Sequence, residues 1–172
     1  MINNKMADAI NAQINAEWYS SYLYISMAAY FDSTGLKGFS NWMRVQAQEE
    51  DFHAKKFFDY LLSRQGQVVL TSIDAPPIEW SSPLAAFEAV YEHEQKVTAL
   101  IHALVGLAHE EKDFASVAML QWFVTEQVEE EANADDLVQK LKRIGDNSGG
   151  LFMLDRELAT RVFTAPAGAD AP

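Results

Sequence analysis

The sequence predicts an all-α fold: a four-helix bundle with one long crossover connection and a short fifth helix near the C-terminal end. Four long segments carry apolar residues at helical spacing and contain little glycine or proline. Short turn-forming stretches join these segments in pairs, which favours antiparallel neighbours. A long stretch containing two prolines separates the pairs, and in extended form it can run the full length of such a bundle.

The first pair of helices is expected at residues 4–31 and 36–64. Residues 32–35 form the turn between them, and Gly66 follows the second helix, where helix C-termini favour glycine. Each helix has a stripe of residues, three or four apart, that we expect to be buried. The stripes are Met6, Ile10, Gln13, Glu17, Ser20, Tyr24, Met27 and Phe31, then Phe39, Met43, Gln46, Glu50, His53, Phe57, Tyr60 and Arg64.

The second pair of helices follows a connection at residues 65–82. Pro76 and Pro77 block a helix there, whereas Ser82 and Pro83 suit an N-cap and a first helical position. We expect one helix from Pro83 to about residue 111 and another, after a turn at 112–113, to about residue 143. Their stripes are Phe87, Val90, Glu94, Val97, Ile101, Leu104 and Ala108, then Leu120, Phe123, Gln127, Glu130, Ala134, Leu137 and Leu141.

A short amphipathic helix is expected at residues 151–163, after a turn-rich interruption at 145–150. Leu151, Leu154, Leu158 and Val162 fall on one side of it. A helix this short is marginal alone, so it needs a partner surface. Residues 1–163 are therefore expected to form one domain, and the Ala/Pro/Gly-rich residues 164–172 a flexible C-terminal tail.

Composition narrows the function classes. The chain has 172 residues and no cysteine, which excludes disulfides, thiolate metal sites and a cysteine nucleophile. Its 25 acidic and 13 basic residues give a net charge of −12, which disfavours nucleic acid and anionic membrane as partners. No secretory signal begins the sequence, and no stretch of about 18 apolar residues is present. We therefore expect a cytoplasmic protein.

Polar side chains interrupt all four stripes at one level. With the hairpins folded at about residues 34 and 112, the groups that fall at this level are Glu17, Glu50, His53, Glu94, Gln127 and Glu130. Buried carboxylates do not stay ionised without compensating cations. Oxygen and nitrogen ligands without thiolate suit iron, manganese or zinc. The sequence therefore predicts a two-metal site in the bundle core.

The expected metal site is asymmetric. Two-metal bundles of this kind combine a glutamate from each of two helices with a Glu-x-x-His unit from each of the other two. Here Glu50-x-x-His53 is one such unit, but the second position holds Gln127-x-x-Glu130. One metal should therefore have a nitrogen ligand, and the other should be bound almost entirely by oxygen.

Several groups near this level have two readings. One position off the stripes, acidic side chains either form a third, outer metal site or are a solvated acidic face; these are Glu49, Glu126 and Glu129. Tyr24 and Trp122 either donate an electron or pack in the core. Three other histidines lie off the stripes and are expected at the surface: His93, His102 and His109.

The sequence resembles the non-haem ferritins of the bacterial type over nearly all of residues 1–163. Residues 150–158 are similar to the start of that family's fifth helix. The motifs that carry the resemblance are Glu17-Trp18-Tyr19 with Tyr24, Glu49-Glu50-x-x-His53, Glu92-His93-Glu94-Gln95, and Gln121-Trp122-Phe123-x-x-Glu126-Gln127-x-Glu129-Glu130-Glu131.

The resemblance implies a homo-oligomeric cage of twenty-four subunits around an iron-storing cavity, with a ferroxidase site in each subunit. By match of position, one iron would take Glu17, Glu50 and His53, and Glu50 would bridge to the second. The second iron would take Glu50, Glu94 and Glu130, with Gln127 close by. An outer third iron would take Glu49, Glu126, Glu129 and Glu130, and Tyr24 matches the tyrosine beside the centre.

Other relatives and functions are distinguished by single residues. Bacterioferritins bind haem through a methionine directly after the bridging glutamate; here that position is Asp51, so no haem is expected. Rubrerythrin-like peroxidases need a cysteine iron site, and this chain has no cysteine. The leading hypothesis is oxidation of Fe(II) to Fe(III) by dioxygen or peroxide, with storage as a ferric mineral. The alternatives are a bundle whose metal is structural and a di-iron oxygenase or peroxidase.

Overall fold

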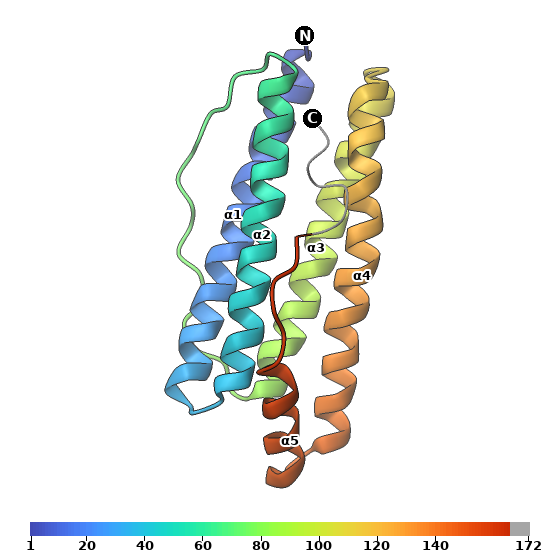
Figure 1. Ribbon diagram of the computed structural model, residues 1–172. Coiled ribbons are helices and arrows are strands. Elements are labelled where there is room, and N and C mark those ends of the chain that lie inside the picture. The colour runs from blue at the N-terminus through green and yellow to red at the C-terminus, as the bar shows by residue number, and fades with distance from the viewer. Residues whose placement is uncertain (166–172) are drawn as a thin grey trace. The chain divides into compact units, whose positions relative to one another are not determined.

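The computed structural model describes residues 1–165, which form five helices and no strand. None of these helices is both long and apolar enough to cross a membrane. The described chain divides into two compact units. The predicted tail at 164–172 falls mostly on residues 166–172, outside the described part. The helices are α1 (Asn4–Ser33), α2 (Lys37–Ser63), α3 (Pro83–Glu110), α4 (Phe114–Ile144) and α5 (Ser148–Leu158) (Figure 1).

Of the described residues, the first unit contains Met1, Ile10–Glu79 and residues 146–165. Within it, α1 and α2 are antiparallel neighbours. Trp18 Nε1 donates to Asp51 Oδ1 (3.2 Å), and Ser21 Oγ donates to the carbonyl of Ala47 (2.7 Å). Moving forward along α1 therefore means moving backward along α2. Gly35 has φ of 83° in the turn between them, a conformation that glycine adopts without strain.

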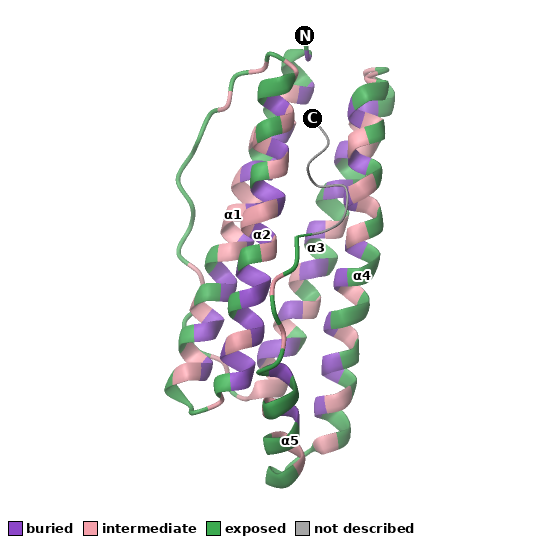
Figure 2. Ribbon diagram, in the orientation of Figure 1, coloured by how far each residue is buried: buried purple, intermediate pink, exposed green. Residues whose placement is uncertain are grey.

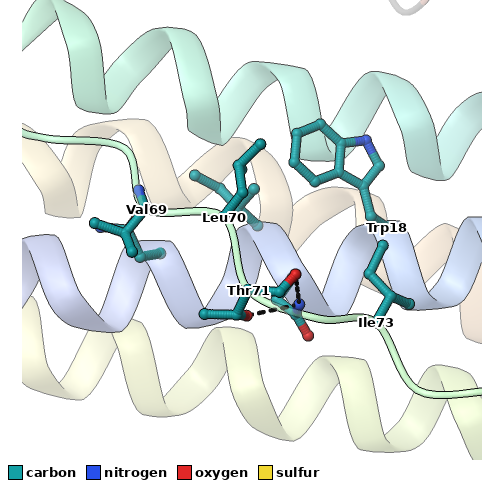
Figure 3. Close-up of a pocket in the computed structure, with 8 residues that line it drawn as sticks. Trp18, Val69, Leu70, Thr71 and Ile73 are labelled. Atoms are coloured by element: carbon teal, nitrogen blue, oxygen red, sulfur yellow. Dashed lines mark hydrogen bonds between the residues drawn. The ribbon is translucent and has the colours of Figure 1, made fainter.

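The long connection runs alongside α1 in the same direction (Figure 1). Asn11 exchanges hydrogen bonds with the backbone of residues 67 and 69, and Asn15 donates to Thr71 Oγ1 (2.9 Å). Further along, Ser26 Oγ donates to the carbonyl of Pro77 (2.6 Å). Several backbone groups of the connection are thus hydrogen-bonded to side chains of α1. Figure 3 shows a small pocket between them, lined by Trp18 of α1 and by Val69, Leu70, Thr71 and Ile73 of the connection, among others.

The α5 helix differs in position from the predicted helix at 151–163. It begins at Ser148, because the Asn147 side chain accepts a hydrogen bond from the Gly150 amide (3.1 Å) and caps it. The interruption predicted at 145–150 is correspondingly shorter. The helix ends at Leu158, whose carbonyl accepts a hydrogen bond from Asn41 Nδ2 (3.1 Å). Val162 therefore lies beyond the helix and is 74% exposed.

The α5 helix packs tightly against the start of α2. Asp155 Oδ1 accepts hydrogen bonds from the backbone amides of Gly38 (2.8 Å) and Phe39 (3.1 Å), which caps the first turn of α2. A Cβ atom on Gly38 would lie 1.6 Å from the Asp155 carbonyl oxygen. Only glycine allows the two backbones to approach this closely. Leu154 and Leu158 are buried, as the predicted stripe requires.

The second unit contains Ile2–Ala9 and Trp80–Gly145. Ser82 caps α3 by accepting from the Ala85 amide (3.0 Å), and Asp113 caps α4 by accepting from the Ser116 amide (3.2 Å). Lys5 forms an ion pair of 2.8 Å with Glu111 at the turn between these helices. The two helices are antiparallel neighbours, as the short turn predicts.

The predicted stripes are buried (Figure 2). Every stripe residue of α1, α3 and α4 is buried. In α2 the stripe is buried from Phe39 to Phe57, while Tyr60 and Arg64, at the end of the helix, are half-buried. Helical periodicity alone therefore identified the buried face of each long helix, including its polar members.

Candidate metal centre

Glu17, Glu50 and His53 form a compact buried group in the first unit. One potential ligand atom from each lies within 4.8 Å of those of the other two. The three residues are only 1–2% exposed. On α2, the three-residue spacing places Glu50 and His53 on one face. The bonds between Trp18 and Asp51 and between Ser21 and Ala47 place Glu17 at the same level on α1.

An amide one helical turn earlier holds each carboxylate of this group. Gln13 Nε2 donates to Glu17 Oε1 (2.8 Å), and Gln46 Nε2 approaches Glu50 Oε1 at 3.4 Å. His53 Nδ1 lies 3.3 Å from Glu50 Oε2. Sequence reasoning placed both glutamines in the buried stripes but gave them no role. The signal was present: Gln13 stands four residues before Glu17, and Gln46 stands four residues before Glu50.

The environment of Glu17 suits a cation. Burial, followed by the negative charge of Glu50, raises the pKa of the Glu17 carboxyl to about 8. His53 and the Gln13 hydrogen bond act in the opposite direction. Within residues 1–165, Glu17 Oε2 is buried without a hydrogen-bond partner. A bound cation would give that oxygen a partner and would stabilise the ionised carboxylate.

The second unit brings Glu94 and Gln127 together. Gln127 Nε2 lies 3.4 Å from Glu94 Oε2 and 3.3 Å from the Glu94 carbonyl. It also donates to Thr98 Oγ1 (3.2 Å), whose hydroxyl donates to Glu131 Oε1 (2.5 Å). Glu94, Gln127 and Glu130 are all buried. Because an amide nitrogen does not bind metal ions, Gln127 would reach one through Oε1. Sequence reasoning gave Thr98 no role.

The residues predicted for an outer metal differ in exposure. Glu49 is half-buried, and its Oε2 forms an ion pair of 2.6 Å with Nη2 of Arg161. Glu126 is half-buried and Glu129 is exposed. Sequence reasoning did not find the arginine, which lies 112 residues from Glu49. Tyr24 is completely buried.

Trp122 and the three histidines outside the stripes differ in how far they are exposed. Trp122 is half-buried, with its ring edge-on to Phe123 at 4.8 Å between centroids. His102 and His109 are exposed, as predicted. His93 is half-buried rather than at the surface, and burial, followed by the charge of Lys96, lowers the pKa of its imidazole to about 4.

Comparison with known proteins places the chain in a family. The model of the ferritin-like domain matches residues 7–144. The chain belongs to the ferritin family. A bacterial non-heme ferritin of Bacteroides fragilis strain 638R is 48% identical over 161 residues, which cover 94% of this chain and 100% of the relative. The bacterial non-heme ferritin of Staphylococcus saprophyticus is 43% identical over 163 residues, which cover 95% and 98%.

Solved ferritin structures match the whole fold. The Archaeoglobus fulgidus ferritin engineered into a closed form by site-directed mutagenesis is 61% identical, with a TM-score of 0.95 over 95% of this chain and 100% of that one. An open-pore ferritin from the same archaeon is 60% identical, with a TM-score of 0.93 over 94% and 100%. The predicted four-helix bundle with a short C-terminal helix is confirmed, and the family's function is iron storage with ferroxidase activity.

Proposed function

We propose that the chain oxidises Fe(II) with dioxygen or peroxide at a di-iron site within each subunit. We further propose that it stores the Fe(III) as a mineral inside a cytoplasmic cage of twenty-four copies. The observation that carries the site is the buried convergence of Glu17, Glu50 and His53, whose ligand atoms lie within 4.8 Å of one another. Iron is here the substrate and the stored product.

The proposed ions share two of their ligands. One iron would take Glu17, Glu50 and His53, and Glu50 would bridge to a second iron held by Glu94 and Glu130. Gln127 would assist the second iron, since its amide already contacts the Glu94 carboxylate. The first position has an imidazole and the second has only oxygen ligands, so the two should differ in affinity. A third, outer iron would take Glu130 together with Glu49, Glu126 and Glu129.

The protein's contribution to the reaction is charge and proximity. Each Fe(II) gives up one electron. Two electrons and two protons convert dioxygen to hydrogen peroxide, or hydrogen peroxide to two waters. Ionised carboxylates stabilise Fe(III) more than Fe(II), and a shared ligand holds both ions close enough to react as a pair. Tyr24, buried two turns from Glu17, is proposed to pack beside the site, while the two irons themselves supply the electrons of this reaction.

Rapid Fe(II) oxidation tests this assignment. Glu17→Ala and His53→Ala each remove a ligand of the first iron, so both should slow the fast phase by at least tenfold without changing particle size. Stopped-flow absorbance after mixing metal-free protein with Fe(II) and dioxygen measures the phase. His102→Ala and Glu110→Ala change exposed residues of α3 and should leave it unchanged. Wild-type kinetics in both ligand variants would refute the assignment.

A further inference from the structure

Arg161 lies just after α5 and is fixed against the middle of α2. Asn41 Nδ2 donates to the carbonyl of Leu158 (3.1 Å) and to the carbonyl of Arg161 itself (2.9 Å). Both bonds come from α2, so they hold the arginine backbone beside that helix. Since α5 also caps the start of α2 through Asp155, the chain that leads to the arginine is anchored on α2 as well. Its side chain can therefore act as a fixed part of the first unit.

The guanidinium contacts α2 along one face over two turns. Nη2 pairs with Glu49 Oε2 at 2.6 Å, and Nη1 donates to Gln46 Oε1 at 2.9 Å. The guanidinium carbon also lies 4.5 Å from the centre of the Trp42 ring. The side chains of the ion pair are only 21% and 19% exposed, so water screens it less than an exposed pair.

These contacts connect Arg161 to two metal-ligand positions. A guanidinium has only donor groups, so it holds the oxygen of the Gln46 amide toward itself. The amide nitrogen then faces Glu50, whose Oε1 lies 3.4 Å away. Arg161 therefore orients the glutamine beside the proposed bridging ligand. Through its other nitrogen it neutralises Glu49, a proposed ligand of the outer iron.

We propose that Arg161 is a positioning residue that controls the outer metal position by competing with the metal for Glu49. This inference rests on the proposed function, in which Glu49 helps bind the third ion. A cation on Glu49 comes close to the guanidinium, and the two like charges repel each other. Metal must therefore displace the arginine to use this carboxylate fully. The outer position consequently fills last and binds most weakly.

Zinc titration of the metal-free protein tests the competition. Zn²⁺ takes the same oxygen and nitrogen ligands without redox chemistry. By calorimetry, Arg161→Gln should tighten the weakest binding step by about tenfold, a common size for coupling between two sites. Glu49→Gln should weaken or remove that step. Arg161→Gln should add nothing in the Glu49→Gln background, because the competition then has no target.

A fluorescence readout follows the arginine itself. Filling the outer position should move the guanidinium off Trp42 and change the indole emission at the last equivalent of Zn²⁺. Trp42→Phe and Glu49→Gln should each abolish that change. If Arg161→Gln does not fold, Arg161→Lys replaces it: a lysine has no planar fork to hold Glu49 and Gln46 together, so the weakest step should still tighten, by a few-fold.

Failure of this inference is distinguishable from failure of the proposed function. A weakest step that stays within twofold of wild type in the folded arginine variant overturns the competition, and so does equal tightening in the Glu49→Gln background. Unchanged tight steps in Glu17→Gln and His53→Ala would instead overturn the proposed first iron site. If Glu17→Gln and His53→Ala lose the tight steps but Arg161→Gln leaves the weakest step unaffected, the proposed function stands. Only the role of Arg161 is then refuted.

Discussion

At the scale of single residues, the proposed metal centre depends on how buried carboxylates keep their oxygens oriented. Gln13 and Gln46 each stand one turn before a glutamate and direct an amide at one of its oxygens. The rest of each carboxylate is then available to other partners. Burial also makes the ionised form of Glu17 costly, as its raised pKa shows. The metal-free centre is therefore held in place by neighbours but is electrostatically unfavourable.

This cost predicts a pH dependence of stability in the metal-free protein. The pKa of Glu17 is about 8 in the folded chain and 4.5 ordinarily, so the folded state keeps a proton that the unfolded chain releases. The stabilising contribution is full below pH 4.5 and is lost as pH rises toward 8. Glu17→Gln is neutral throughout. As the pH rises between these two values, the free energy of unfolding of Glu17→Gln should therefore increase relative to wild type by a few kcal/mol. Its melting temperature should rise relative to wild type accordingly.

Differential scanning calorimetry of both proteins, stripped of metal, measures this difference, in which titrating groups far from Glu17 cancel. Saturating Zn²⁺ provides the control. Because metal binding favours the ionised ligand, wild type should gain more stability from Zn²⁺ than Glu17→Gln does. A melting-temperature difference that stays constant across the pH range would contradict the assigned titration of Glu17.

At the scale of elements, α5 and the residues after it fasten the start of α2. The Asp155 cap, the contact at Gly38 and the two Asn41 bonds all join parts of the chain more than 100 residues apart. Periodicity predicted a short helix that needs a partner surface, and α2 is that surface. Periodicity predicted this helix at 151–163, whereas α5 runs from Ser148 to Leu158. The predicted start is three residues late and the predicted end five residues late, because both ends depend on side-chain caps.

The close approach at Gly38 predicts a large effect of one methyl group. Gly38→Ala puts a Cβ atom 1.6 Å from the Asp155 carbonyl oxygen, a backbone atom that cannot rotate away. The helices must separate, so we expect a loss of stability of about 2 kcal/mol or more. Hydrogen exchange in residues 148–161 should become faster. Melting temperature and exchange mass spectrometry measure the two effects.

Gly106→Ala is the matched control. This glycine lies inside α3, and a Cβ there would meet nothing within 4 Å. Alanine should raise stability by roughly 0.5–1 kcal/mol through helix propensity. Equal effects of the two substitutions would mean that the α2–α5 approach is not tight in solution.

At the scale of the whole molecule, the chain should assemble into its cage before any iron is added. Large apolar side chains remain exposed on the single chain, including Phe152 (62%) and Met153 (72%) on α5. Exposed apolar surface of this kind favours subunit contacts. Light scattering of metal-free protein should therefore report an assembled particle, with the mass of twenty-four subunits if the proposed cage is right.

Excess Fe(II) added in air should then increase the mass of the particle without changing its outer radius, and the solution should turn brown. A scaffold that only binds metal would stop once its ligand positions were filled. A monomeric species, or iron uptake that ends at that point, would contradict storage in a cage. Scattering and sedimentation of the same sample separate these outcomes.

The sequence by itself determined the long helices, their buried faces and the residues proposed as ligands. Helical spacing is a local property, so Glu17, Glu50, His53, Glu94 and Glu130 could be recognised as polar members of apolar stripes. The family motifs then pointed to iron. Turn length alone was enough to predict that α1 and α2 are antiparallel neighbours, and likewise α3 and α4.

Only the tertiary structure decided the contacts between residues far apart in the chain. No local pattern links Arg161 to Glu49 and Gln46, or requires glycine at position 38, because each depends on how α5 meets α2. Likewise, the half-burial of His93 and the raised pKa of Glu17 follow from packing around those side chains. Periodicity tells which side of a helix is buried, whereas contact distance and desolvation depend on what packs against that side.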